Sequence, residues 1–201
     1  MSPVTVWANG NQSSSLILNT LKKDRVMEHT SKKINALWGN IFARADGTQT
    51  DTTADILLRC ILFQKLSRRE LKKVAHIIYE RSYPAGEYLF EKDQPGAAMF
   101  IIKKGLVKIV VPTQSGDEVE LAALDRDSFV GELALLDDSP RSASAKAVED
   151  TEAVAFFRED LNNLLNTNPE IASKIFKELA VIVGRRLKTT NEQLYRNNEK
   201  P

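Results

Sequence analysis

The sequence has little of two residue types that define common classes of protein. Of its 201 residues, one is cysteine and two are histidine. The single thiol, Cys60, excludes an intramolecular disulfide and a cysteine-based metal cage. A haem or an iron–sulfur cluster needs more cysteine or histidine ligands than this chain has. We therefore expect no metal.

The sequence also lacks a large net charge and a long hydrophobic run. Its 28 Lys and Arg oppose 27 Asp and Glu, for a formal charge of +1. This balance gives no electrostatic argument for nucleic acid or a membrane surface. The start, MSPVTVWANGNQSSS, lacks the basic and apolar regions of a signal peptide, and no run long enough to span a bilayer follows. We expect a soluble cytoplasmic protein that binds neither DNA nor a membrane.

Catalytic groups are scarce too. His29 lies in the N-terminal part of the chain and His76 within a stretch of helical pattern, so both are remote from the motif described below. No nucleophile–base pair and no metal-ligand spacing is visible. The sequence therefore predicts a protein that is not an enzyme.

What is present supports one well-packed domain with extensions, because 42% of the residues are hydrophobic. Residues 1–53 are interpreted as an N-terminal helical extension and linker. Its apolar residues have helical spacing, and the extension packs on the body of the protein or on a partner. These residues are Ile34, Leu37, Trp38, Ile41 and Phe42.

The next part, residues 54–168, is predicted to be a β-barrel domain preceded by helices. One helix covers roughly 54–63, and Ser67 with Glu70 forms a capping box that begins a second helix, expected to run to about Ser82. Short β-prone runs separated by turn signals then follow, as is typical of a barrel or jelly roll. These runs are 87–90, 97–104, 106–112, 119–125, 142–149 and 152–158. The expected fold is mainly β with flanking helices: an antiparallel β jelly-roll barrel, N-terminal helices, a short cassette helix and a long C-terminal helix.

The last part, residues 169–201, is predicted to be one long lid or dimer helix. Asn168 is a good N-cap and Pro169 suits the first turn. The helix carries two apolar stripes, and the second has the alternating spacing of a two-stranded coiled coil. A homodimer is the favoured interpretation, and a helix wholly buried in its own domain is the alternative. The stripes are Ile171, Ile175, Leu179 and Ile182, and Phe176, Ala180, Val183, Leu187, Thr190 and Leu194.

The most informative stretch is FVGELALLDDSPRSASAKA, residues 129–147, which we name the cassette. Gly131 suits a tight turn beside a ligand, and a helix that begins there points free amides at an anion. Arg141 presents donors that fit two oxygens of a phosphate. Glu132 repels phosphate but accepts hydrogen bonds from hydroxyls. Together these groups fit a ribose and a phosphate, which is the shape of a cyclic nucleotide.

Each of these two residues also has a simpler explanation. Arg141 fits a surface salt bridge to Asp137 or Asp138, and Glu132 fits an ordinary acidic residue at a helix start.

The ordered set Gly-Glu-Leu-Ala-Leu-Leu, Pro-Arg-Ser-Ala and Lys-Ala resembles the phosphate-binding cassette of the cyclic nucleotide-binding domain family. This resemblance covers about residues 60–199. It implies that Glu132 binds the ribose 2′-hydroxyl and Arg141 the cyclic phosphate. It further implies roles beside the ribose, phosphate and base for Gly131, Leu133, Ala134, Ser142 and Ala143.

The segment 185–191 is similar to the dimer helix of the family's transcription factors, in which a hydroxyl pair touches adenine. Thr190 and Asn191 stand at those positions, with asparagine in place of a serine. These residues favour cyclic AMP as the ligand, while a hydroxyl at Ser142 keeps cyclic GMP as the alternative.

The resemblance implies a sensor that changes conformation to control a partner protein, which the sequence does not identify. No helix-turn-helix segment follows the dimer helix, so we expect a stand-alone sensor or a fragment of something longer. An interaction module of the same fold that no longer binds nucleotide is the competing hypothesis.

Overall fold

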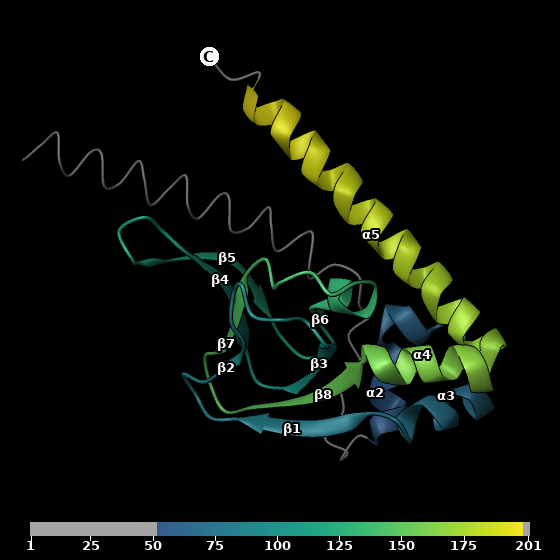
Figure 1. Ribbon diagram of the computed structural model, residues 1–201. Coiled ribbons are helices and arrows are strands. Elements are labelled where there is room, and N and C mark those ends of the chain that lie inside the picture. The colour runs from purple at the N-terminus through teal and green to yellow at the C-terminus, as the bar shows by residue number, and fades with distance from the viewer. Residues whose placement is uncertain (1–51, 199–201) are drawn as a thin grey trace, which may run out of the picture.

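The computed structural model describes residues 52–198, in which two four-stranded antiparallel sheets form a barrel and helices gather at one end of it (Figure 1). The sheets have the strand orders β1-β8-β3-β6 and β2-β7-β4-β5. The predicted fold class is confirmed. The strands are β1 (Tyr79–Tyr83), β2 (Tyr88–Phe90), β3 (Ala98–Lys104), β4 (Val107–Pro112), β5 (Glu118–Leu124), β6 (Phe129–Val130), β7 (Ser144–Ala147) and β8 (Thr151–Phe157).

Helices precede, interrupt and follow the barrel. They are α2 (Thr53–Arg59), η1 (Ile61–Phe63), α3 (Arg68–Ala75), η2 (Glu132–Leu135), α4 (Arg158–Thr167) and α5 (Pro169–Asn198). The predicted capping box begins α3: the Ser67 hydroxyl accepts a hydrogen bond from the Glu70 amide, and the Glu70 carboxylate accepts one from the Ser67 amide. The start of α3 is therefore specified by residues next to it in the sequence.

The expected end of the second helix was wrong. Helix α3 ends at Ala75, and residues 79–82, which were expected to form its last turn, belong instead to strand β1, which pairs with β8 over its whole length. The ring of Tyr79 also packs edge-on against Phe157 of β8, with 5.4 Å between the ring centroids. This partner lies far along the chain, and long-range strand pairing overrides a local apolar pattern.

Apolar side chains gather in two clusters on opposite faces of the sheet β1-β8-β3-β6. Successive side chains of a strand point to opposite faces. Accordingly Ile101 of β3 and Phe156 of β8 face the helices, whereas Ile102 and Ala155 face the interior of the barrel. We name these the helical cluster and the barrel cluster.

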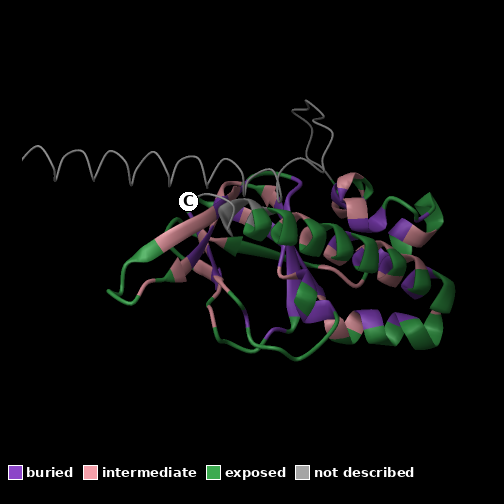
Figure 2. Cartoon of the chain, turned by 90° about the horizontal axis from the view of Figure 1, so that it is seen from above, coloured by how far each residue is buried: buried purple, intermediate pink, exposed green. Residues whose placement is uncertain are grey.

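Helix α5 has two unequal halves. The first apolar stripe, which ends at Ile182, is buried in the helical cluster. In the second stripe Leu187 is 61% exposed and Leu194 is 57% exposed. Figure 2 shows this change along the helix, with purple on the half near α4 and green toward the C-terminal end. The outer half of α5 therefore presents apolar side chains that the described part of this chain does not cover.

The predicted extension over residues 1–53 lies almost entirely outside the described residues, and the division of the chain into 1–53, 54–168 and 169–201 stays a prediction. Within residues 52–198, no helix combines the length and the hydropathy that crossing a bilayer requires.

Candidate functional site

Gly131 makes the turn that leads from β6 into η2. Its φ of +80° lies in the left-handed region, which favours glycine. A β-carbon at this position would collide with Nη1 of Arg141 and come within 3.3 Å of the carbonyl oxygen of Ala98. Glycine is therefore required both by the backbone angle and by the guanidinium group that lies against it.

The turn that follows, η2, is a short 3-10 helix. Its residues Ala134 and Leu135 are buried and anchor the turn. Leu133 and Leu136 are 48% and 45% exposed, so only part of the apolar run 133–136 points inward. A helix this short has an outer side that its neighbours leave uncovered.

Arg141 is buried and held by neutral groups. Its Nη2 donates to the carbonyl oxygen of Ala98 at 2.5 Å and its Nη1 to that of Gly131 at 3.2 Å. The guanidinium carbon lies 4.1 Å from the centre of the Phe90 ring. Its Nε is also buried, and it has no hydrogen-bond partner among residues 52–198. The surface salt bridge considered from the sequence is not what the structure shows.

Burial lowers the pKa of Arg141 from 12.5 to about 10. The nearby Glu132 carboxylate opposes this shift, and the positive charge of Arg158 adds to it. Arg141 thus remains charged at neutral pH, but its charge is less well stabilised than in water. An anion placed beside it would restore that stabilisation.

The backbone of Arg141 is fixed by the loop between β2 and β3. Its amide donates to the carbonyl oxygen of Gln94 at 2.9 Å, and its carbonyl oxygen accepts from the amide of Asp93 at 2.8 Å. Next to these bonds, Pro95 and Pro140 form an isolated antiparallel bridge. The backbone of Arg141 is therefore positioned by a segment that is remote in sequence.

Glu132 is buried and forms an ion pair with Arg186 of α5. The guanidinium carbon of Arg186 also lies 5.1 Å from the centre of the Phe129 ring. The carboxylate is thus more than an acidic residue at a helix start. It joins the cassette directly to the C-terminal helix, and it keeps the capacity to accept a further hydrogen bond, because a carboxylate has about four acceptor positions.

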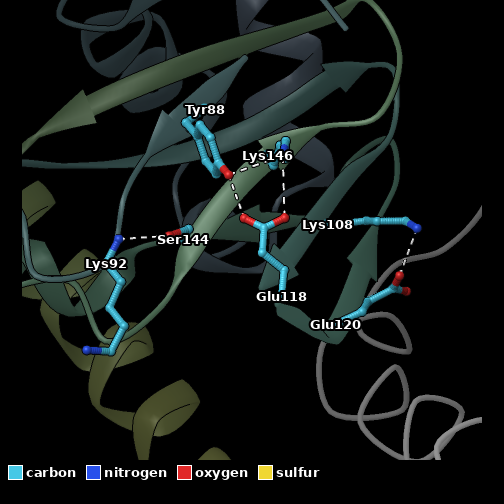
Figure 3. Close-up of polar contacts among 7 residues, drawn as sticks. All are labelled: Tyr88, Lys92, Lys108, Glu118, Glu120, Ser144 and Lys146. Atoms are coloured by element: carbon cyan, nitrogen blue, oxygen red, sulfur yellow. Dashed lines mark hydrogen bonds and ion pairs between the residues drawn. The ribbon is translucent and has the colours of Figure 1, made fainter. Parts of the chain in front are cut away.

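The last strand of the cassette, β7, is fixed by polar contacts on its outer face (Figure 3). The hydroxyl of Ser144 accepts from the amide of Lys92 at 2.9 Å. The ammonium group of Lys146 lies 3.1 Å from the hydroxyl of Tyr88 and 3.4 Å from the carboxylate of Glu118, which itself accepts from Tyr88. These cross-strand contacts hold the segment after Arg141 in register.

The structure brings most of the predicted site residues together on the cassette. Ser142 is exposed, and Ala143 is half-buried against the barrel cluster. Thr190 and Asn191 are exposed on α5, and the Thr190 hydroxyl donates within its own helix, to the carbonyl oxygen of Arg186 at 2.9 Å. Their role toward a ligand stays a prediction.

Sequence reasoning missed three side chains that shape the site: Phe90, Arg158 and Arg186. The contact of Arg186 with Glu132 gave no local signal, because the two residues lie on separate elements that are remote in sequence. Phe90 and Arg158 gave no local signal, because their partners come from other segments.

The barrel thus buries a guanidinium beside a carboxylate on one short segment, an arrangement whose chemistry fits a small ligand that carries an anion and a hydroxyl. Within the described part of the chain, no group of three or more acidic, histidine or cysteine side chains is placed to hold a metal.

Comparison with known proteins defines the family. The profile of the cyclic nucleotide-binding domain matches residues 80–168. The N-terminal domain of a transcriptional regulator from Streptomyces coelicolor is 30% identical, with a TM-score of 0.61 over 70% of this chain and 95% of that chain. The chain belongs to the cyclic nucleotide-binding domain family, as the sequence resemblance indicated.

Two further similarities come from Thermus thermophilus. Its cyclic AMP receptor protein is 36% identical over 133 residues, which are 66% of this chain and 60% of that protein. The crystal structure of its catabolite activator protein is 34% identical, with a TM-score of 0.62 over 69% of this chain and 63% of that chain. The chain spans about 60% of the length of the curated relatives it matches first.

Proposed function

We propose that this domain binds cyclic AMP and is a regulatory sensor, not an enzyme. The ribose 2′-hydroxyl donates to Glu132, and the exocyclic oxygens of the cyclic phosphate accept from Arg141. Gly131, Leu133 and Ala134 lie beside the ribose. Ser142 and Ala143 lie at the phosphate and at the edge of the base.

The observation that carries this proposal is the surroundings of Arg141. A buried cation is costly unless an anion pairs with it. Here its partners are two carbonyl oxygens and an aromatic ring, and its Nε has no hydrogen-bond partner in the described part of the chain. A cyclic phosphate, with one negative charge and two free oxygens, supplies the missing charge and acceptors.

The ion pair between Glu132 and Arg186 supports a regulatory role. A hydroxyl that donates to Glu132 uses a remaining acceptor position of the same carboxylate that Arg186 of α5 contacts, so the ligand and the helix meet at one group. A ligand shifts a conformational equilibrium only if it binds one arrangement better. Through this pair, the nucleotide favours one position of α5 and so exposes or hides a surface for a partner protein in the cytoplasm.

The choice of cyclic AMP rests on Thr190 and Asn191. They follow Arg186 by one turn on α5, so they lie on the part of the helix that Arg186 joins to the cassette. Hydroxyl and amide groups there can meet the polar edge of adenine. Cyclic GMP is the second candidate, because the exposed hydroxyl of Ser142 is able to contact a guanine amino group.

The exposed stripe of α5 supports a homodimer. Leu187 and Leu194 continue the heptad spacing beyond the helical cluster, and the described residues leave both more than half exposed. A second α5 would cover this stripe. Sedimentation velocity with Leu187→Glu tests it: we expect a dimer for the wild type and a monomer for the variant, and a monomeric wild type contradicts the dimer.

Calorimetric titration of the purified protein with cyclic AMP and, separately, cyclic GMP tests the nucleotide proposal. We expect tighter binding of cyclic AMP, and loss of most affinity in Arg141→Ala with its fold retained by circular dichroism. Arg81→Ala removes a similar charge from an exposed strand and serves as the matched control.

Each failure of this titration has a distinct meaning. Near-normal binding by Arg141→Ala contradicts the role of Arg141. Absence of binding of either nucleotide by the wild type would leave the interaction module as the better explanation of the fold.

A further inference from the structure

The part of the cassette that follows Glu132 is held by Arg158, the first residue of α4. Its Nη1 donates to the carbonyl oxygen of Ala134 at 3.2 Å and to that of Asp137. The same nitrogen lies 3.0 Å from a carboxylate oxygen of Asp138. One guanidinium group therefore ties the first residue of α4 both to η2 and to the loop that leads to Arg141.

This contact matters because η2 is too short to stabilise itself. It has four residues, and the last carbonyl groups of a helix have no partner within the helix. Arg158 supplies a charged donor to Ala134 within η2, and hydrogen bonds from charged donors are stronger than neutral ones. Most of the Arg158 side chain is shielded from water, being 24% exposed. The position of residues 134–138 thus depends on α4.

Helices α4 and α5 consequently contact the cassette at two places. Arg158 holds it from the start of α4, and Arg186 holds Glu132 from α5. A single residue, Asn168, separates α4 from α5, and the two helices pack on each other. A displacement of the cassette relative to the barrel therefore acts on both helices.

We propose that Arg158 is a positioning residue for the nucleotide site: it fixes residues 134–138 so that Glu132 and Arg141 face the same ligand, and it passes the movement of the cassette to α4. This role rests on the proposed function, because it requires that a nucleotide bind between Glu132 and Arg141. Arg158 does not itself contact the nucleotide in this scheme.

Hydrogen exchange measured by mass spectrometry tests the holding role without any ligand. In Arg158→Ala, we expect the amides of residues 133–138 to exchange at least about tenfold faster than in the wild type, since a charged anchor has been removed. Arg81→Ala is the matched control and leaves these amides unchanged. Unchanged exchange in Arg158→Ala would overturn the holding role.

Calorimetry and exchange with cyclic AMP test the positioning role. We expect the affinity of Arg158→Ala to fall about tenfold and that of Arg158→Lys to fall less, because lysine keeps the charge but not the planar donor group. Cyclic AMP should protect the first turn of α4 in the wild type, and this protection should be lost in Arg158→Ala while the cassette stays protected.

The outcomes separate the two hypotheses. A wild type that binds no cyclic nucleotide contradicts the proposed function itself. A wild type that binds, together with an Arg158→Ala variant that has equal affinity and equal protection of α4, overturns the role of Arg158 alone. Should Arg158→Ala fail to fold, Arg158→Lys and Asp138→Asn carry the same comparison.

Discussion

The helical cluster and the barrel cluster share one sheet between them but differ in the size of their side chains. Of the 21 buried residues of the helical cluster one is alanine, Ala172, and the rest include phenylalanine, leucine and isoleucine. Of the 13 buried residues of the barrel cluster six are alanine. These six are Ala98, Ala122, Ala145, Ala147, Ala153 and Ala155.

Because of this difference, we expect the helical cluster to contribute mainly to stability and the barrel cluster mainly to binding. Free energy from burial grows with the apolar area removed from water, at about 25 cal/mol per Å². Large side chains therefore make the helical cluster the main source of stability. The small side chains of the barrel cluster lie behind the elements that carry the site, since Ala98 accepts from Arg141 and Ala145 pairs with Phe90. Mutations in the two clusters should accordingly have different consequences.

The largest effect is expected for Phe156→Ala in the helical cluster. Phe156 is fully buried and packs edge-on against Phe63, with 5.8 Å between the ring centroids. Removing a buried phenylalanine costs about 3–5 kcal/mol, because transfer energy is lost and a cavity remains. Urea unfolding followed by circular dichroism measures the loss. A change below about 1 kcal/mol would contradict the importance given to this cluster.

Ala145→Leu in the barrel cluster should, in contrast, affect nucleotide affinity more than stability. Overpacking a filled interior costs about 1–3 kcal/mol. Since Ala145 pairs with Phe90, on which Arg141 stacks, nucleotide affinity should fall more than stability does. Ala172→Leu, which overpacks the helical cluster, is the matched control. The distinction between the clusters is wrong if both variants lose affinity equally, as measured by calorimetry.

The sequence predicted the barrel because its signals are local and repeated. Short apolar runs alternate with turn residues such as Gly105 and Gly116, both of which have positive φ in the structure. The capping box at Ser67 was found for the same reason. The course of residues 76–83 was not predicted, because strand β1 exists only through its pairing with β8, and no local pattern specifies that partner.

The site was predictable in its composition but not in its connections. Glu132 and Arg141 stand out from their small and apolar neighbours, so the sequence identified both. What they contact could not be read: Arg186 on Glu132, and Phe90 beneath Arg141, come from α5 and β2. The sequence also did not indicate that Asp138 pairs with Arg158 instead of Arg141. Tertiary contacts decide which charges meet.

A smaller effect is expected where α5 leaves the helical cluster. Gly184 lies two residues beyond the last buried residue of the first stripe, and a β-carbon there would meet no atom within 4 Å. Gly184→Ala should therefore raise the free energy of unfolding by about 0.5–1 kcal/mol, through the better helix propensity of alanine. Urea unfolding checks it. A destabilised variant would mean that another chain approaches the helix closely at this point.

The smallest effect concerns a polar contact that closes the helical cluster at its edge. The ammonium group of Lys174 on α5 donates to Glu70 on α3 at 2.7 Å. This hydrogen bond, aided by the amide and hydroxyl of Ser67, lowers the pKa of Glu70 from 4.5 to about 2. Because the folded pKa is the lower one, the contribution to stability is complete above pH 4.5 and is lost as the pH falls toward 2.

Glu70→Gln tests this contact by urea unfolding at two pH values. A partly exposed pair contributes at most about 1 kcal/mol, so we expect the variant to be less stable than the wild type by up to that amount at about pH 7. At about pH 3 the difference should shrink, because the unfolded wild type then binds a proton that the folded protein does not. Lys174→Met, which removes the main cause of the shift, should reduce the pH dependence in the same way. An equal difference at both pH values would show that the contact acts through packing and not through charge. The association of α3 with α5 would then depend on their apolar side chains alone.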